Sequence, residues 1–134
     1  MASVTAEGEL GADVDEVWKV VGDFGGFLEA VGMTPTIEGE GIGQTRTVTM
    51  GAAPLVERLE ARDEATKTVK YSVVSGPLPV SNYLSTIQLS SAGEGRTKIE
   101  WSATFEPVGD EATAVSLLER VYEGGIGGLQ RRFG

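Results

Sequence analysis

Apolar and polar residues alternate with a period of two along most of the middle of the chain. That period places successive side chains on opposite faces of a β-strand. Several such stretches, joined by short connections, predict antiparallel strands with one face toward solvent. The predicted strands are residues 3–10, 44–50, 55–62, 68–74, 83–89 and 97–105.

Helical patterns appear on either side of these strands. Residues 13–18 open a helix, with Asp13 as its cap and Glu16 completing a capping box. A short helix or turn begins at Asp23, and a long helix begins near Asp110. In that last helix the apolar residues recur every three or four positions, at Val115, Leu118, Tyr122, Ile126, Leu129 and Phe133.

Four glycines, Gly124, Gly125, Gly127 and Gly128, lie inside the last predicted helix. Each one costs a helix roughly 1 kcal/mol relative to alanine. One interpretation is that the helix frays at Gly124. The other is that the helix lies over a sheet and the glycines leave a cavity between them. Leucine at Gly125 or Gly128 would then shrink the cavity and leave folding largely intact.

The order of elements predicts an α+β fold: one strand, two short helices, about six strands and a long helix. A single amphipathic helix must cover the apolar face of a large sheet. A strongly curved antiparallel sheet of about seven strands, wrapped around the C-terminal helix, meets that requirement. We expect one domain over residues 1–134, a length that supports a single core.

Two charged residues, Arg46 and Glu57, lie at positions of their strands that alternate onto the apolar face. A buried charge is costly unless it is paired. If Gly51 and Ala52 form a two-residue hairpin loop, with the glycine opening a type II′ turn, Arg46 lies directly opposite Glu57. The pair is then either a structural ion pair or a polar anchor on a cavity wall.

Aromatic and polar residues share the inferred inner face with this pair, which favours a lined pocket. Two loops, residues 24–27 and 76–79, combine glycine or proline with apolar side chains and are candidates for the pocket mouth. The candidate ligand-binding residues are Phe24, Phe27, Arg46, Val48, Glu57, Tyr71, Leu78, Tyr83, Ser85, Trp101, Tyr122 and Gly125.

Composition narrows the chemistry, because the 134 residues include no histidine and no cysteine and carry a formal charge of −9. Thiol catalysis, Ser-His-Asp triads, disulfides and His/Cys zinc sites are excluded. A carboxylate metal site stays open, but no Asp/Glu spacing resembles an EF-hand loop, and we expect no metal and no cofactor. The negative charge argues against nucleic-acid binding. The absence of a long apolar run or a signal-peptide pattern predicts a cytoplasmic protein without stable membrane insertion. We expect a monomer or homodimer.

Short motifs in a fixed order carry a family resemblance: Val17-Trp18, Gly41-Ile42-Gly43-Gln44-Thr45-Arg46, Glu57-Arg58-Leu59 followed by Asp63, and Asn82-Tyr83. The chain resembles the START/Bet v 1-like (SRPBCC) superfamily over its whole length. Within it, the chain looks most like the polyketide cyclase/dehydrase and lipid transport family. The resemblance implies a helix-grip fold, in which a curved sheet grips a C-terminal helix around an apolar cavity.

The chain is more distantly similar to plant abscisic acid receptors. Three pocket residues of those receptors match Glu57, Tyr83 and Ser85, and their closing loops correspond to residues 51–54 and 76–79. The receptors' latch histidine is missing here, so the resemblance does not imply hormone signalling. Many bacterial relatives carry a tryptophan near residues 29–31. Its absence from this chain predicts a more open pocket mouth.

Three functions are compatible with these features. The first is binding of a small hydrophobic molecule, lipid-like, polyketide or terpenoid, in the internal cavity. The second is a polyketide cyclase, aromatase or dehydratase, in which Glu57 with Tyr71 or Tyr83 transfers protons and Arg46 holds negative charge. The third is a protein-interaction module that uses the acidic surface. Without histidine the catalytic base must be a carboxylate, which favours binding over catalysis.

Overall fold

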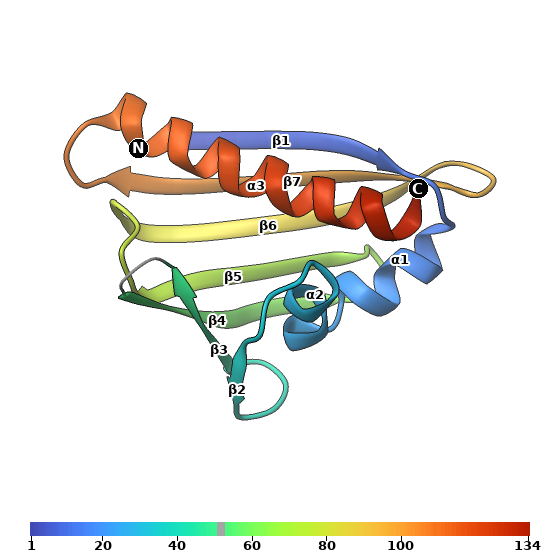
Figure 1. Ribbon diagram of the computed structural model, residues 1–134, viewed down its shortest axis with the longest axis horizontal. Helices are drawn as coiled ribbons and strands as arrows, with labels where there is room; N and C mark the ends of the chain where they lie inside the picture. The colour runs from blue at the N-terminus through green and yellow to red at the C-terminus, as the bar shows by residue number, and fades with distance from the viewer. Residues whose placement is uncertain (51–52) are drawn as a thin grey trace.

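The computed structural model describes residues 1–50 and 53–134. All the strands in this part of the chain belong to one seven-stranded sheet. The strand order is β1-β7-β6-β5-β4-β3-β2, and each neighbouring pair is antiparallel. Helix α3 crosses one face of the sheet over β1 and β7, with α1 and α2 beside it (Figure 1). The elements are β1 (Ala2–Leu10), α1 (Val14–Val21), α2 (Phe24–Ala30), β2 (Thr36–Glu38), β3 (Thr45–Met50), β4 (Ala53–Asp63), β5 (Thr68–Ser75), β6 (Val80–Gly93), β7 (Arg96–Pro107) and α3 (Glu111–Phe133).

The α+β helix-grip fold predicted from the sequence is confirmed, including the two short helices after the first strand. Six of the strands correspond to the predicted stretches. The seventh, β2, was not assigned because it has only three residues and all three are exposed. Such a strand has no buried side, so its sequence has no alternation to detect.

The core forms where the inner face of the sheet meets the apolar stripe of α3. Along β7 every second residue is buried, from Thr97 to Phe105, as the period-two pattern predicts. On α3 the buried residues Leu118, Tyr122 and Ile126 follow the predicted helical spacing. These two periodicities position the helix against the sheet, and the candidate site lies beside their contact.

Helices α2 and α3 begin where the sequence predicts, and an aspartate caps each of them. The Asp23 side chain accepts a hydrogen bond from the Gly26 backbone N–H at 3.1 Å, and Asp110 accepts one from Thr113 at 2.9 Å. The predicted capping box at Asp13 is wrong. Its carboxylate instead accepts the Gly95 backbone N–H at 2.7 Å, so a distant hairpin uses the oxygen that the helix was expected to use.

Helix α3 continues without a break through all four glycines, so the fraying interpretation is wrong. The expectation that leucine at Gly125 or Gly128 would be tolerated is also wrong. An added Cβ at Gly125 would lie 2.5 Å from the Trp101 ring, and one at Gly128 would lie 2.8 Å from Val31. These two glycines allow close packing. At Gly124, by contrast, no atom lies within 4 Å of an added Cβ.

These neighbouring glycines give opposite predictions for alanine. Gly124→Ala is expected to raise the free energy of unfolding by about 0.5–1 kcal/mol, because alanine favours the helix and meets open space. Gly125→Ala is expected to lower it by about 1–3 kcal/mol, because the Trp101 ring has to shift. Urea denaturation of both variants measures the difference. Equal stabilities would show that the Trp101 contact does not constrain the helix.

Candidate functional site

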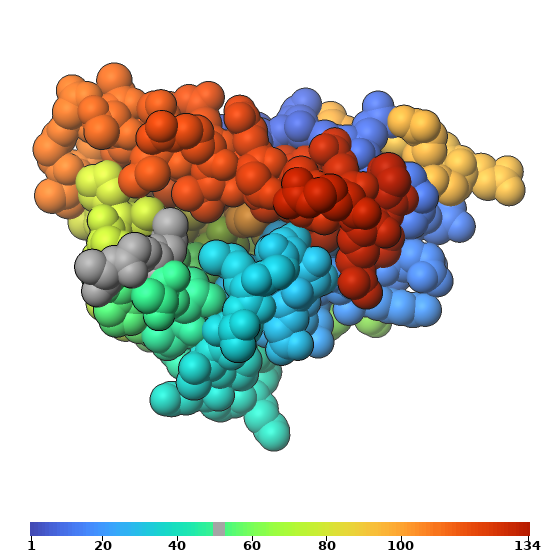
Figure 2. All heavy atoms as spheres, in the orientation of Figure 1, coloured from blue at the N-terminus to red at the C-terminus, as the bar shows by residue number. Residues whose placement is uncertain are grey.

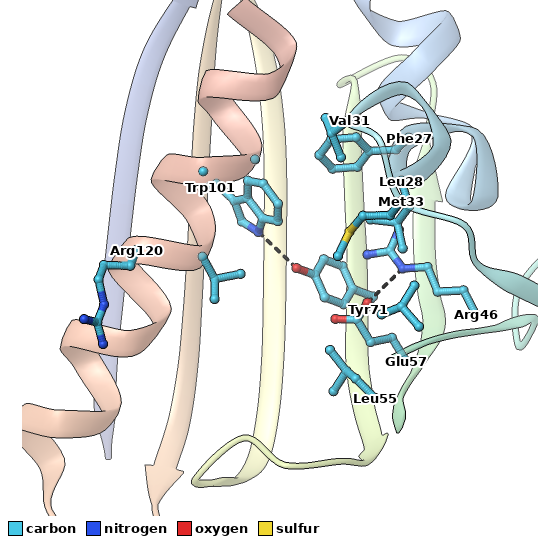
Figure 3. Close-up of a pocket in the computed structure, with 14 residues that line it drawn as sticks. Phe27, Leu28, Val31, Met33, Arg46, Leu55, Glu57, Tyr71, Trp101 and Arg120 are labelled. Carbon is cyan, nitrogen blue, oxygen red and sulfur yellow. Dashed lines mark hydrogen bonds and ion pairs between the residues drawn. The ribbon is translucent and has the colours of Figure 1, made fainter. Parts of the chain in front are cut away.

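A cavity of about 330 Å³ lies between α2, the middle of α3 and the inner face of strands β3, β4, β5 and β7. In the space-filling view, α2 and the middle of α3 lie on either side of a recess (Figure 2). The close-up shows side chains from both helices and from the strands gathered around the same space (Figure 3). The lining residues are Phe27, Leu28, Val31, Met33, Arg46, Val48, Leu55, Glu57, Tyr71, Trp101, Arg120, Val121, Gly124 and Gly125.

Arg46 and Glu57 form an ion pair in the wall of this cavity. They are cross-strand partners in the predicted register, and the Arg46 Nε lies 2.9 Å from the Glu57 Oε1. Both are buried, with exposed fractions of 2% and 6%. The register prediction is therefore confirmed, whereas the predicted type II′ turn at residues 51–52 lies outside the described residues.

The Arg46 guanidinium is held on several sides. Its Nη1 donates to the Phe24 carbonyl at 2.8 Å. Its Cζ lies 3.9 Å from the centre of the Phe24 ring and 4.8 Å from that of Tyr71. Cation–π contacts of this kind strengthen when water is excluded. The packing fixes the charged pair to the start of α2, so the pair also positions this wall of the cavity.

A second polar group, built from hydroxyls, lies deeper between the sheet and α3. The Trp101 Nε1 donates to the Tyr71 hydroxyl at 3.1 Å and to the Ser85 Oγ at 3.0 Å. The Tyr122 hydroxyl donates to the Ser85 Oγ at 3.3 Å and also bonds the Tyr83 hydroxyl. These bonds satisfy polar groups that would otherwise be costly to bury.

Burial raises the pKa of all three tyrosines. For Tyr71 it raises the pKa from 10.0 to about 12, and the nearby Glu57 charge adds to the shift. Burial also holds the pKa of Tyr83 and Tyr122 well above the ordinary value. At neutral pH the three side chains are therefore uncharged phenols, which donate and accept hydrogen bonds without releasing a proton.

Of the twelve candidate residues, the structure brings seven to the cavity: Phe27, Arg46, Val48, Glu57, Tyr71, Trp101 and Gly125. Tyr83, Ser85 and Tyr122 instead lie in the hydroxyl network behind it. Phe24 supports the Arg46 guanidinium, and Leu78 packs against neighbouring core residues without lining the cavity.

Sequence reasoning missed seven lining residues, Leu28, Val31, Met33, Leu55, Arg120, Val121 and Gly124. The three on α3 could have been found from the sequence, because Arg120 and Val121 lie one helical turn before Gly124 and Gly125 and so share their face of the helix. Leu55 shares the strand parity of Glu57. The residues at the end of α2 had no local signal, since only the docking of that helix places them at the cavity.

Within residues 1–50 and 53–134, no group of three or more histidine, cysteine, aspartate or glutamate side chains could hold a metal ion. No helix in residues 1–50 or 53–134 is long and apolar enough to cross a membrane.

Family comparison agrees with the fold described above. The family model for polyketide cyclase/dehydrase and lipid transport proteins matches residues 1–134. The chain belongs to this family. No curated protein matches the sequence. This chain has the complete helix-grip fold, with the seven-stranded antiparallel sheet and the long C-terminal helix α3.

Solved structures extend this family likeness. An uncharacterized protein from Bacillus thuringiensis is 29% identical, has a TM-score of 0.89 and matches over 98% of each chain. XoxI from Bacillus cereus is 29% identical, with a TM-score of 0.88 over 99% of this chain and 96% of its own. Norcoclaurine synthase from Thalictrum flavum, solved with dopamine and hydroxybenzaldehyde, is 18% identical over 97% of this chain and 84% of its own, with a TM-score of 0.79. At that identity the likeness concerns the fold alone.

Proposed function

We propose that this chain binds a small, mainly apolar molecule in the cavity between the sheet and α3. The observation that carries the proposal is a cavity of about 330 Å³ whose wall is largely aliphatic and aromatic but includes the buried Arg46–Glu57 pair. Ligand pockets commonly measure roughly 300–1,000 Å³ and combine apolar walls with a few polar groups. Membership of a family that includes lipid transport proteins supports the same function.

Catalysis as a cyclase or dehydratase has weaker support from the site. The pKa values of Tyr71 and Tyr83, raised by burial, make both side chains poor proton-transfer groups at neutral pH. One oxygen of Glu57 is already bonded to Arg46. Binding needs none of these groups to change its protonation state, so it is the function that the geometry supports best. No feature of the described surface favours a protein-interaction module.

Native mass spectrometry of protein purified from its own host tests the proposal. We expect a retained apolar molecule, because replacing water at these apolar walls with an apolar ligand lowers the free energy. Val48→Phe places a ring in the cavity and should abolish retention. Val56→Phe is the matched control: Val56 lies on the neighbouring strand, outside the cavity, and the variant should retain the ligand. An empty wild-type protein that also fails to bind a hydrophobic dye would refute the proposal.

A further inference from the structure

Strand β1 forms one edge of the sheet and has a neighbouring strand on one side only, β7 (Figure 1). This edge strand has nine residues, whereas β2 at the opposite edge has three. Natural sheets protect long edges with prolines, bulges or lysines, because free backbone groups there pair with other chains. β1 contains no proline and no lysine, and its register with β7 is uninterrupted. The described sheet therefore has one long edge that is open to a further strand.

The bonds of the neighbouring strands show which β1 backbone groups are free. In an antiparallel sheet, alternate residues of a strand bond the neighbour on one side, and the residues between them bond the other side. The Leu89 N–H bonds the Lys67 carbonyl on the β5 side of β6, so its β7 partner Ile99 bonds β1, where it faces Gly8. Gly8 and every second residue of β1 thus bond β7. The residues that direct their backbone groups away from the sheet are Ser3, Thr5, Glu7 and Glu9.

Three of these four residues have free backbone groups. The Glu9 carbonyl accepts a hydrogen bond from the Gln130 Nε2 at 3.3 Å, so α3 already uses the far end of the edge. Within the described part of the chain, no bond reaches the outward N–H and C=O groups of Ser3, Thr5 or Glu7, and these residues are exposed. Such groups bond either water or another strand.

The side chains favour one register for pairing with a second copy of β1. With a two-fold axis at Thr5, the two Thr5 residues face each other, and Ser3 of each copy faces Glu7 of the other. On the inner face, Val4 lies opposite Ala6, so the buried side chains there are small and apolar. Threonine pairs, and a hydroxyl opposite a carboxylate, are favourable cross-strand neighbours. The two Glu7 carboxylates are then roughly 13 Å apart along the strands, beyond the Debye length of about 8 Å at physiological salt.

Other alignments of the two strands are less favourable. An axis at Glu7 places the two Glu7 carboxylates directly opposite each other, where like charges are destabilising. An axis at Ala6 requires the Glu9 carbonyl, which Gln130 already uses. An axis at Ser3 leaves Glu7 without an opposite residue, so fewer bonds form. The axis at Thr5 is the one that uses all three free residues without opposing like charges.

We propose that two copies of this chain pair β1 edge to edge, antiparallel, with the two-fold axis at Thr5. Three opposed pairs of outward residues exchange about six backbone hydrogen bonds, and the two sheets become one continuous sheet. The formal charge of −9 on each copy opposes association, so the dimer is weak and added salt strengthens it. No β1 residue lines the cavity described above, so pairing leaves both cavities open.

Sedimentation velocity at increasing protein concentration tests the pairing. We expect the mean mass to rise from 14.1 kDa toward twice that value in the high-micromolar range, and to rise further when salt is added. Thr5→Pro should keep the protein monomeric, because proline removes the central outward N–H and is tolerated at an edge where that N–H faces solvent. Thr5→Val is the matched control. It keeps the N–H, so the variant should still dimerise.

Single cysteines test the register, because the chain has no cysteine of its own. Residues directly opposite in a hydrogen-bonded antiparallel pair have Cα atoms about 5.5 Å apart, a separation that a disulfide spans. Thr5→Cys should therefore form a covalent dimer quickly in oxidised glutathione. Glu7→Cys is the matched control on the same edge. Its two sulfurs are too far apart in this register, so the covalent dimer should form more slowly.

The outcomes of these two experiments decide the inference. A wild-type protein that stays monomeric at every protein and salt concentration overturns it. A Thr5→Pro variant that dimerises while keeping its circular dichroism also overturns it and places the interface elsewhere. Faster disulfide formation by Glu7→Cys than by Thr5→Cys overturns the register, whether or not the proline variant folds. Because the edge is separate from the cavity, ligand retention by Thr5→Cys should equal that of the wild type, and the proposed binding function stands or fails independently.

Discussion

Replacing Glu57 with alanine is expected to lower the free energy of unfolding by about 3–5 kcal/mol, because it leaves a buried cation without a partner. Arg46 is only 2% exposed and is packed against the Phe24 and Tyr71 rings, so water cannot easily take the place of the lost carboxylate. Chemical denaturation followed by circular dichroism measures the effect.

The same strand provides a matched control. Glu60 pairs with Arg58 at the same N–O distance of 2.9 Å, but the side chains are 33% and 49% exposed. Glu60→Ala is therefore expected to cost no more than about 1 kcal/mol. Replacing both Arg46 and Glu57 with apolar residues should cost less than Glu57→Ala alone, since no unpaired charge remains. Equal losses for Glu57→Ala and Glu60→Ala would contradict a special role for burial.

Alkaline pH is expected to unfold the protein through its tyrosines. The three buried tyrosines are the only ones in the chain, and burial raises the pKa of each in the folded state. A raised folded pKa contributes stability that is complete below the unfolded value, near pH 10, and is lost as the pH rises. For Tyr71, with a folded pKa of about 12, the loss amounts to about 3 kcal/mol between pH 10 and pH 12.

Phenolate absorbance measured against pH tests this expectation. The folded protein should show almost no phenolate near pH 10, followed by one steep step that coincides with loss of secondary structure. In concentrated denaturant the same three tyrosines should titrate near pH 10. Gradual phenolate formation in a protein that keeps its circular dichroism would mean that the tyrosines are not sealed from water.

The charged pair shows that strand periodicity predicts which residues face each other across a hairpin. Arg46 and Glu57 each break the apolar pattern of a strand, and counting outward from a two-residue connection places them opposite each other. Register is a local property of a hairpin, so the sequence predicts it. The same reasoning places Tyr71 and Trp101 on the inner face, where the structure has them.

The cavity boundary depends on arrangements that periodicity does not encode. Val31 and Met33 line it only because the end of α2 docks next to α3. The α3 glycines were misjudged for the same reason: the distance from Gly125 to the Trp101 ring depends on how closely the helix approaches the sheet. The inward-facing Tyr83 and Tyr122 were expected to meet a ligand, but they bond each other.

The sheet order has a consequence for folding kinetics. From β2 to β7 every strand pairs with its neighbour in sequence, so these hairpins close short loops. β1 instead pairs with β7, and residues such as Ala2 and Phe105 meet across most of the chain. Closing so long a loop has a large entropic cost, and non-local pairing of this kind slows folding. The meander is expected to assemble first, and the edge next to β7 remains open until the first strand arrives.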